Sequence, residues 1–260
     1  MSFDRIASNY QFFETIAFGN ALQRARIAFI SRIRDDERVL VLGEGDGRFL
    51  AELLRRKPEA EIDCIDASAA MIQSARARAA VIPSEARDLA SGHKRLASSL
   101  GPSPPQDDSV RVMNRTGVVC APRDDASLQL SELSCVQFHH ADILDWLPPQ
   151  RSYDVVVTNF FLDCFTRRQL PAIVEKIGNA TALNSRWLFS DFSIPPYALG
   201  GLHAKVWLRV MYSFFRIVAD LEANELVDAS PLIRAAGFQL REERMTRFGL
   251  IKSQLWERSS

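Results

Sequence analysis

Apolar and polar positions along the chain predict helices first and buried strands after them. Over residues 1–34 the apolar residues recur at helical spacing, and Gly19 and Asn20 separate two predicted helices. Residues 39–42 then form a short run without a polar position. Such a run is typical of a parallel strand that helices cover on both faces. The chain therefore begins as a helical segment that leads into a buried sheet.

The alternation of strands and helices continues and is then interrupted. A helix that ends by Pro58, a strand at 62–65 and a helix that starts near Ser68 follow the first strand. From 83 to 131 the chain is rich in Pro, Ser, Arg and Asp and has no sustained period. Because a loop this long is uncommon inside a compact domain, we interpret 83–131 as a disordered or weakly ordered surface insertion. A partner-binding loop is the alternative.

The second half of the chain resumes the pattern. It predicts, in order, strand 135–138, strand 153–159, helix 167–182, strand 187–192, aromatic-rich helix 202–221, helix 231–236 closed by Gly237, and strands 238–245 and 249–256. The last two strands have the separation of a hairpin. Residues 1–260 are therefore expected to form one α/β domain, a Rossmann-like, doubly wound, mostly parallel seven-stranded sheet with a C-terminal antiparallel hairpin.

Composition and charge limit the classes of partner. Of the 260 residues, 47% are apolar and 25% are charged, an ordinary balance for a globular domain. Lys+Arg and Asp+Glu both number 32, so no net positive charge attracts a nucleic acid, and we expect no nucleic-acid partner. The four cysteines are scattered without a CxxC pair, so no metal site is expected. Without a secretory segment or an apolar run of roughly 20 residues, we expect a cytoplasmic protein without integral membrane association.

A glycine-rich turn follows the first predicted strand. Gly43, Gly45 and Gly47 form the pattern GxGxG between this strand and a helix. Backbone N–H groups at such a turn can approach a nucleotide-like ligand closely. In the dinucleotide fingerprint GxGxxG the third glycine stands five residues after the first, whereas here it stands four after it. The shorter spacing argues against NAD or FAD.

An acidic residue ends the second predicted strand. Asp66 stands 19 residues after Gly47. A carboxylate at this position of a Rossmann-like sheet can accept hydrogen bonds from both ribose hydroxyls of an adenosyl group. The alternative is an N-cap for the helix that begins near Ser68.

Four segments resemble, in chain order, the motifs of class I methyltransferases that depend on S-adenosylmethionine (SAM). Residues 39–47 read VLVLGEGDG and resemble the first motif, VLDLGCGTG. Residues 65–72 resemble the second motif, 138–143 the third, and 154–163 the motif of the fourth strand. The resemblance covers almost the whole chain outside the insertion and implies SAM as the cofactor.

The resemblance also implies the cofactor-binding residues. Asp142 would contact the adenine amino group, the backbone of Ile143 would meet the adenine ring, and Asn159 would lie beside the methionine moiety. The segment from Phe3 to Tyr10 resembles the family's lid helix, with Tyr10 over the cofactor; a solvated amphipathic helix is the alternative. The implied set is Tyr10, Gly43, Glu44, Gly45, Gly47, Asp66, Ala67, Met71, Asp142, Ile143 and Asn159.

One position departs from the family pattern. The family usually carries an acid at the position of Val41, where it helps to hold the methionine amino group. Glu44 or Asp46 would supply the charge from within the turn, and we favour Glu44. Asp46 has an alternative explanation as an acid of the first helical turn.

Methyl transfer from a sulfonium is an in-line displacement, so alignment and desolvation supply most of the acceleration and no fixed catalytic residue is required. A general base is needed only where the acceptor must lose a proton. Four candidates follow the fourth and fifth strands, and each also has an explanation as a loop or cap residue: Asp163, Asp191, Tyr197 and His203. N6-adenine and protein-glutamine methyltransferases resemble one another in an NPPY or DPPY sequence at this place. Residues 159–162 read NFFL instead, and this lack of resemblance argues against an exocyclic amine of a base as the acceptor.

The apolar helix at 202–221 indicates the type of acceptor. Between 206 and 218 it is apolar on nearly every side, apart from Arg209 and Arg216. It is similar to the cap of quinone- and lipid-type methyltransferases, so we expect a small, lipophilic acceptor. Burial in a homodimer is an alternative, and contact with a membrane surface ranks last.

The sequence therefore predicts an enzyme that transfers a methyl group from SAM to a small, apolar molecule. The alternative is a catalytically degenerate SAM-binding or partner-interaction module, which Val41 and the lack of an assigned base motivate. An NAD-dependent oxidoreductase is disfavoured by the glycine spacing and by the lack of a recognisable Tyr-xxx-Lys pair.

Overall fold

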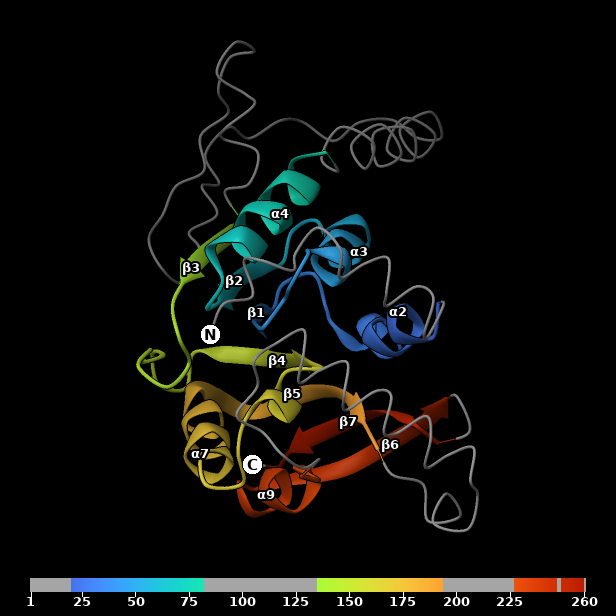
Figure 1. The fold of residues 1–260 in the computed structure, drawn as a ribbon, viewed down its shortest axis with the longest axis vertical. Coiled ribbons are helices and arrows are strands. Elements are labelled where there is room, and N and C mark those ends of the chain that lie inside the picture. Colours follow the sequence, from blue (N-terminus) through green and yellow to red (C-terminus); the bar gives the residue numbers. More distant parts are fainter. Residues whose placement is uncertain (1–19, 82–134, 194–226, 247–248, 260) are drawn as a thin grey trace, which may run out of the picture.

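A seven-stranded sheet with helices on both faces forms the centre of the molecule (Figure 1). The computed structural model describes residues 20–81, 135–193, 227–246 and 249–259. The strands are β1 (Arg38–Leu42), β2 (Glu61–Asp66), β3 (Val136–His140), β4 (Tyr153–Asn159), β5 (Thr181–Phe192), β6 (Phe238–Thr246) and β7 (Ile251–Arg258). The described helices are α2 (Ala21–Arg26), η2 (Ile30–Arg32), α3 (Arg48–Arg56), α4 (Ala69–Ala80), η3 (Leu162–Cys164), α7 (Leu170–Ala180) and α9 (Ser230–Ala235).

The order of the strands creates a switch point beside β1. The sheet runs β3-β2-β1-β4-β5-β7-β6, and its first five strands in this order are parallel. Strand β7 pairs antiparallel with both β5 and β6, which confirms the predicted C-terminal hairpin. The chain moves outward from β1 to β3 on one side and continues with β4 on the other. Ligands of open α/β sheets bind at the carboxyl ends of the strands where the order reverses.

Two apolar cores explain why residues 39–42 lack a polar position. Val39 and Val41 face α3 and α4 in one core, whereas Leu40 and Leu42 face α7 and α9 in the other. Successive side chains of a strand point to opposite faces, so a strand between two helical layers must be apolar on both. Figure 1 shows α2, α3 and α4 on one side of the sheet and α7 and α9 on the other.

Strand β5 differs most from its predicted boundaries. The sequence predicts a strand at 187–192, but β5 begins at Thr181, directly after α7. Its pairing with β4 is irregular between Tyr153 and Val155, and Asn184 has a φ of 62°. The exposed residues at this end of the strand break the apolar pattern, so the pattern reveals only the buried carboxyl half.

The start of α4 and the end of α9 lie where capping residues in the sequence predict them, unlike the start of β5. Ser68 is the N-cap of α4, and its Oγ accepts a hydrogen bond from Met71 N at 3.3 Å. Gly237 follows α9 with a φ of 93°, the left-handed conformation that glycine adopts at helix ends. Both signals confirm predictions from the sequence.

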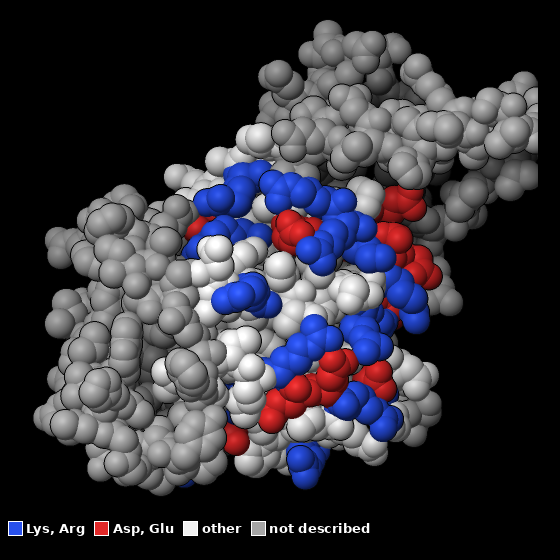
Figure 2. Space-filling model, turned by 90° about the vertical axis from the view of Figure 1, so that its right-hand side faces the viewer, with Lys and Arg blue, Asp and Glu red and all other residues white. Residues whose placement is uncertain are grey.

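Charged side chains of both signs lie next to one another on the face drawn in Figure 2. Described ion pairs at the surface include Arg32 with Glu242 at 2.9 Å and Arg56 with Glu52 at 2.6 Å. Among the helices of the described ranges, none is long and apolar enough to cross a membrane. The predicted lid at 3–10, the insertion at 83–131 and the helix at 202–221 lie outside the described residues.

Candidate functional site

The glycine turn between β1 and α3 uses left-handed backbone at three positions. Gly43, Gly45 and Gly47 have φ values of 64°, 66° and 84°. A Cβ on Gly43 would lie 2.3 Å from Phe161 Cδ2, and one on Gly47 would lie 2.6 Å from Ala75 Cα. A Cβ on Gly45 would meet no described atom within 4 Å. Two glycines therefore permit close packing, and the middle one leaves space above the turn.

Asp66 links the turn to the second strand. Its Oδ2 accepts a hydrogen bond from Gly45 N at 3.1 Å, and its Oδ1 accepts one from Ser68 N at 2.9 Å. The carboxylate therefore lies beside the turn at the carboxyl end of β2 and also orders the start of α4. The alternative interpretation made Asp66 the N-cap of this helix. It is wrong, because the N-cap of α4 is Ser68.

Glu44 is a buried carboxyl group within the turn. Its Oε1 accepts a hydrogen bond from Leu50 N at 2.8 Å, which satisfies a free donor in the first turn of α3. Burial raises the pKa of Glu44 to about 8, and the nearby carboxylate of Asp46 adds to this effect. Because this pKa lies above 7, Glu44 is largely protonated at neutral pH. The charge of Arg26 acts in the opposite direction.

Arg26 is a residue of this site that the sequence analysis missed. It is the last residue of α2, and its guanidinium lies 5.2 Å from the centre of the Phe160 ring. Its charge lowers the pKa of Glu44, so the cation lies near the glycine turn. The residue belongs to a helix far from the motifs in sequence, so no local pattern identified it.

Asp46 joins the two helices next to the turn. Its carboxylate forms ion pairs with Arg48 at 3.0 Å and with Arg78 of α4 at 3.5 Å. Its carbonyl oxygen also accepts a hydrogen bond from Arg78 Nε at 2.9 Å. These contacts tie α3 to α4, which favours a structural role for this acid.

The loop after β3 lies beside the end of β2. Ala141 N donates a hydrogen bond to the carbonyl oxygen of Asp66 at 3.1 Å, so the following Asp142 and Ile143 are held near the same edge. The Oδ1 of Asp142 accepts a hydrogen bond from Leu144 N at 2.9 Å. Ile143 is buried, and Lys176 Nζ donates a hydrogen bond to its carbonyl oxygen.

Asn159 ends β4 with a side-chain amide nitrogen that has no described partner. The residue is only 9% exposed, and its Nδ2 makes no hydrogen bond to any described group. The next residue, Phe160, has a φ of 53°, and its N–H donates to the carbonyl oxygen of Ser190 at 2.8 Å. A buried donor without a partner is costly in a folded protein and is often explained by a ligand or a water molecule.

Two candidate bases meet at the ends of β4 and β5. Asp163, in η3, and Asp191, in β5, lie close enough for each to affect the pKa of the other. Burial is the main cause that raises the pKa of both groups, and the repulsion between them raises that of Asp191 further.

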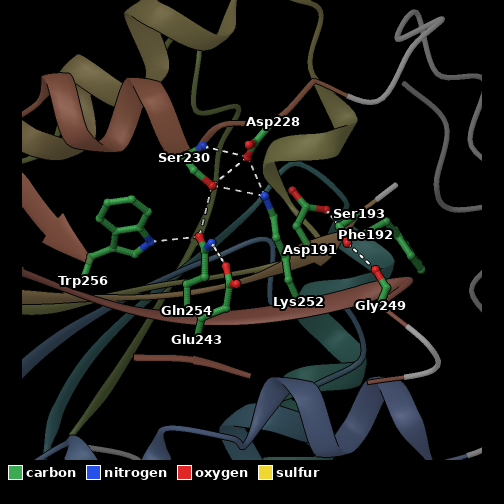
Figure 3. Close-up of polar contacts among 10 residues, drawn as sticks. All are labelled: Asp191, Phe192, Ser193, Asp228, Ser230, Glu243, Gly249, Lys252, Gln254 and Trp256. Carbon is green, nitrogen blue, oxygen red and sulfur yellow. Dashed lines mark hydrogen bonds and ion pairs between the residues drawn. The ribbon is translucent and has the colours of Figure 1, made fainter. Parts of the chain in front are cut away.

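A buried lysine lies on the neighbouring strand (Figure 3). Lys252 of β7 is the register partner of Asp191, and only 7% of its side chain is exposed. Its ammonium donates hydrogen bonds to Asp228 and, at 3.1 Å, to the Oγ of Ser230. The charge of Lys252 lowers the pKa of Asp191, against the larger effect of burial.

The structure thus brings most of the sequence-predicted residues to one edge of the sheet. Residues of the turn, Asp66, Ala67, Asp142, Ile143 and Asn159 all lie at the carboxyl ends of β1 to β4 or directly after them, and the buried Met71 lies in the first turn of α4. The predicted residues Tyr10, Tyr197 and His203 lie outside the described ranges. Within those ranges, no group of three or more His, Cys, Asp or Glu side chains is arranged to hold a metal ion.

Comparisons by sequence and by structure give different results. No protein-family model matches the sequence, and no curated protein matches it either. In fold, the chain is similar to an O-methyltransferase family protein from Burkholderia thailandensis at 17% identity and a TM-score of 0.57, over 100% of this chain and 64% of the other. It is also similar to the S-adenosylmethionine-dependent methyltransferase SibL at 16% identity and a TM-score of 0.58, over 99% and 62%.

A third similar structure carries ligands. It is the 1,6-didemethyltoxoflavin-N1-methyltransferase of Burkholderia thailandensis, with bound 1,6-didemethyltoxoflavin and S-adenosylhomocysteine. The identity is 14%, the TM-score is 0.54, and the match covers 99% of this chain and 86% of that one. The chain therefore has the fold of SAM-dependent methyltransferases, and it spans less than two thirds of the length of the O-methyltransferase family protein and of SibL.

Proposed function

We propose that this protein transfers a methyl group from SAM to a small, apolar molecule by in-line displacement. The observation that carries the proposal is the set of Gly45, Asp66, Asp142 and Asn159 along one carboxyl edge, at the point where the strand order reverses. A solved structure of the same fold supports it, because that protein holds S-adenosylhomocysteine.

The residues at the edge fit the parts of this cofactor. Asp66 would accept hydrogen bonds from the ribose, while Asp142 and the backbone of Ile143 would hold the adenine. Asn159 offers the methionine moiety a buried amide donor that lacks a described partner. Bound SAM would supply an electrophilic methyl group on a sulfonium. Alignment of the acceptor with this methyl group, and exclusion of water from both, would provide most of the acceleration.

The methionine end would be held by opposite charges from two elements. Glu44 would bind the ammonium, and Arg26 would bind the carboxylate through its planar guanidinium. The charge of Arg26 lowers the pKa of Glu44, so the two groups lie near one another. This pair would replace the acid that the family carries at Val41, whose side chain is buried in the core between the sheet and α3.

Calorimetry with S-adenosylhomocysteine tests the proposal directly. We expect the wild-type protein to bind it, and we expect Asp66→Ala to weaken binding at least tenfold, because about 1.4 kcal/mol corresponds to a factor of ten and charge-assisted hydrogen bonds contribute about 1.5–3 kcal/mol. The matched control is Asp145→Ala, because Asp145 is an exposed acid on the loop after β3. If the wild-type protein shows no heat of binding with S-adenosylhomocysteine but binds NAD, the proposal is wrong.

A SAM-binding or partner-interaction module without catalysis remains the second candidate. Val41 favours it, because it is only 1% exposed and no acid stands at this place in β1. In that case the protein would bind S-adenosylhomocysteine but transfer no methyl group to any acceptor. The cytoplasmic location, the lipophilic acceptor and the homodimer stay predictions.

A further inference from the structure

A hollow lined by arginines lies away from the residues of the proposed cofactor site. Its volume is about 440 Å³, and its lining includes the acid Glu257 and four arginines from four parts of the fold. The four are Arg34 after η2, Arg186 in β5, Arg241 in β6 and Arg258 at the end of β7. We call this place the basic hollow.

The basic hollow lies at the opposite edge of the sheet from the glycine turn. Arg186 is in register with Val155 of β4, and Val155 is in register with Val39 near the start of β1. The glycine turn follows the other end of β1. Arg258 ends β7, which runs antiparallel to β5 and so finishes where β5 begins. The hollow is therefore at the amino ends of the parallel strands and is separate from the proposed cofactor site.

Glu37 holds two of the arginines in place. Its side chain is buried, and it pairs with Arg34 at 2.8 Å and with Arg186. Arg186 also donates a hydrogen bond to the carbonyl oxygen of Arg32. Asp36 lies 3.7 Å from Arg34, but 84% of its side chain is exposed, so water screens its charge. Glu37 therefore fixes the two guanidinium groups and neutralises one of their two charges.

The other two arginines use only part of their hydrogen-bonding capacity. Arg241 pairs through Nε with Glu257 at 2.9 Å, and Arg258 donates through Nη1 to the carbonyl oxygen of Gly178 at 2.6 Å. A guanidinium group has five N–H donors. Among the described residues, none accepts a hydrogen bond from the terminal nitrogens of Arg241 or from Nη2 of Arg258. Groups that are already held in this way lose less conformational freedom when they bind an anion.

The charges around the basic hollow favour a ligand with two negative charges. Four guanidinium groups lie near two carboxylates, Glu37 and Glu257, which leaves an excess of two positive charges. A phosphate monoester carries about −1.5 to −2 charges at pH 7, whereas a carboxylate or a sulfate ester carries a single one. The planar fork of arginine also matches phosphate oxygens bidentately.

The size of the hollow and the geometry of β6 support the same class of ligand. A volume of about 440 Å³ falls within the range of small-molecule sites, about 300–1,000 Å³, so it has room for an organic group beside a phosphate. The pairing of β6 with β7 is irregular between Leu240 and Glu242, which places Arg241 at a β-bulge. Bulges re-aim side chains, and Arg241 here reaches Glu257 in the lining.

We propose that the basic hollow binds a small molecule that carries a phosphate monoester. Arg241 and Arg258 donate hydrogen bonds to the phosphate oxygens, and Arg34 and Arg186 add positive charge beside them. Because the hollow lies at the opposite edge of the sheet from the glycine turn, this inference goes beyond methyl transfer and does not depend on it.

Calorimetry with phenyl phosphate and phenyl sulfate at constant ionic strength tests the site. The two probes have similar shapes, so we expect saturable binding of phenyl phosphate and weaker binding of the singly charged phenyl sulfate. Arg241→Met and Arg258→Met should each weaken phenyl phosphate binding about tenfold or more, because each removes charge-assisted hydrogen bonds. Arg244→Met is the matched control: Arg244 lies on the same strand with 51% of its side chain exposed, against 49% for Arg241, and is not in the lining.

The possible outcomes separate this site from the cofactor site. Arg241→Met decides the test even if Arg258→Met fails to fold, because Arg241 lies half exposed at the surface. Equal affinity for the two probes, unchanged affinity in Arg241→Met, or no heat with phenyl phosphate at millimolar concentration overturns the proposal. Binding of double-stranded RNA without binding of phenyl phosphate also overturns it. We expect Arg241→Met to bind S-adenosylhomocysteine as the wild-type protein does, so a failure of the proposed function is read separately.

Discussion

At the scale of residues, Glu44 is an acid whose protonation state should change when the cofactor binds. It is protonated at neutral pH because burial raises its pKa to about 8. An ammonium group next to it would favour the carboxylate, so its proton should leave when the cofactor binds. The hydrogen bond from Leu50 N to Oε1 leaves the second oxygen for such a contact.

We therefore expect the protein to release up to one proton when it binds SAM at pH 7. Calorimetric titrations in buffers with different ionisation enthalpies would measure this release. Glu44→Gln should abolish the release and weaken binding. A binding enthalpy that is independent of the buffer in the wild-type protein, or unchanged affinity in Glu44→Ala, would show that Glu44 does not hold the methionine end.

The glycines of the turn differ in what limits their replacement. Gly45→Ala meets only the cost of left-handed backbone, about 1–2 kcal/mol, because no described atom lies near its Cβ position. Gly47→Ala adds a clash, since its Cβ would lie 2.6 Å from Ala75 Cα, a backbone atom. Overpacking costs about 1–3 kcal/mol more.

Urea unfolding of the two variants measures this difference. We expect Gly47→Ala to lower the free energy of unfolding by about 1–3 kcal/mol more than Gly45→Ala does. Equal losses in the two variants would mean that α3 and α4 shift apart easily, contrary to the ties that Asp46 makes between them.

At the scale of elements, the ends of β4 and β5 hold two acids at a cost in stability. The pKa of Asp163 is raised to about 6 and that of Asp191 is raised as well, mainly by burial. A carboxyl group with a raised pKa binds a proton more tightly in the folded state than in the unfolded state. Its contribution to stability is therefore complete below the unfolded pKa and is lost as the pH rises through the folded pKa.

Thermal unfolding as a function of pH tests this sign. Asp191→Asn should unfold at a higher temperature than the wild-type protein at pH 8, and the difference should shrink towards pH 4. Asp145→Asn should show no such trend, because Asp145 is exposed. An Asp191→Asn protein that is less stable at pH 8 would indicate that the pair serves the fold.

The hairpin of β6 and β7 brings Lys252 to the same place. Because its charge lowers the pKa of Asp191, we expect Lys252→Met to raise the pKa of the pair and move the acid limb of the pH–rate profile to higher pH. Arg244→Met is the control, since Arg244 lies on β6 with half of its side chain exposed. If the acid limb of Lys252→Met stays at the wild-type pH, the charge of Lys252 does not affect the pKa of the pair.

At the scale of the whole molecule, the sheet is continuous on both sides of the predicted insertion. Strands β2 and β3 pair in parallel, and α4 packs against both. Helix α4 starts at the carboxyl end of β2 and returns towards the amino end, where β3 begins. A short connection can close such a crossover. Replacing 84–130 by a Gly-Ser linker should preserve S-adenosylhomocysteine binding and cooperative unfolding; loss of both would show that the segment belongs to the fold.

Much of the fold could be predicted from local pattern. The apolar run at 39–42, the strand at 153–159 and the terminal hairpin lie where expected, because burial on one or both faces dictates side-chain polarity directly. The start of β5 at Thr181 could not be predicted in this way. That end of the strand is exposed and irregular, so its residues carry no apolar signal.

The sequence by itself determined the sheet and the glycine turn, since side-chain period and left-handed glycines are local properties of the chain. It also identified Asp163 and Asp191 as separate candidates. Only the tertiary structure decided that burial raises the pKa of both, that Lys252 stands opposite Asp191, and that Arg26 lies near the turn. Contacts between residues far apart in sequence depend on strand order, register and burial. Those quantities, which also set the pKa values, exist only in the folded sheet.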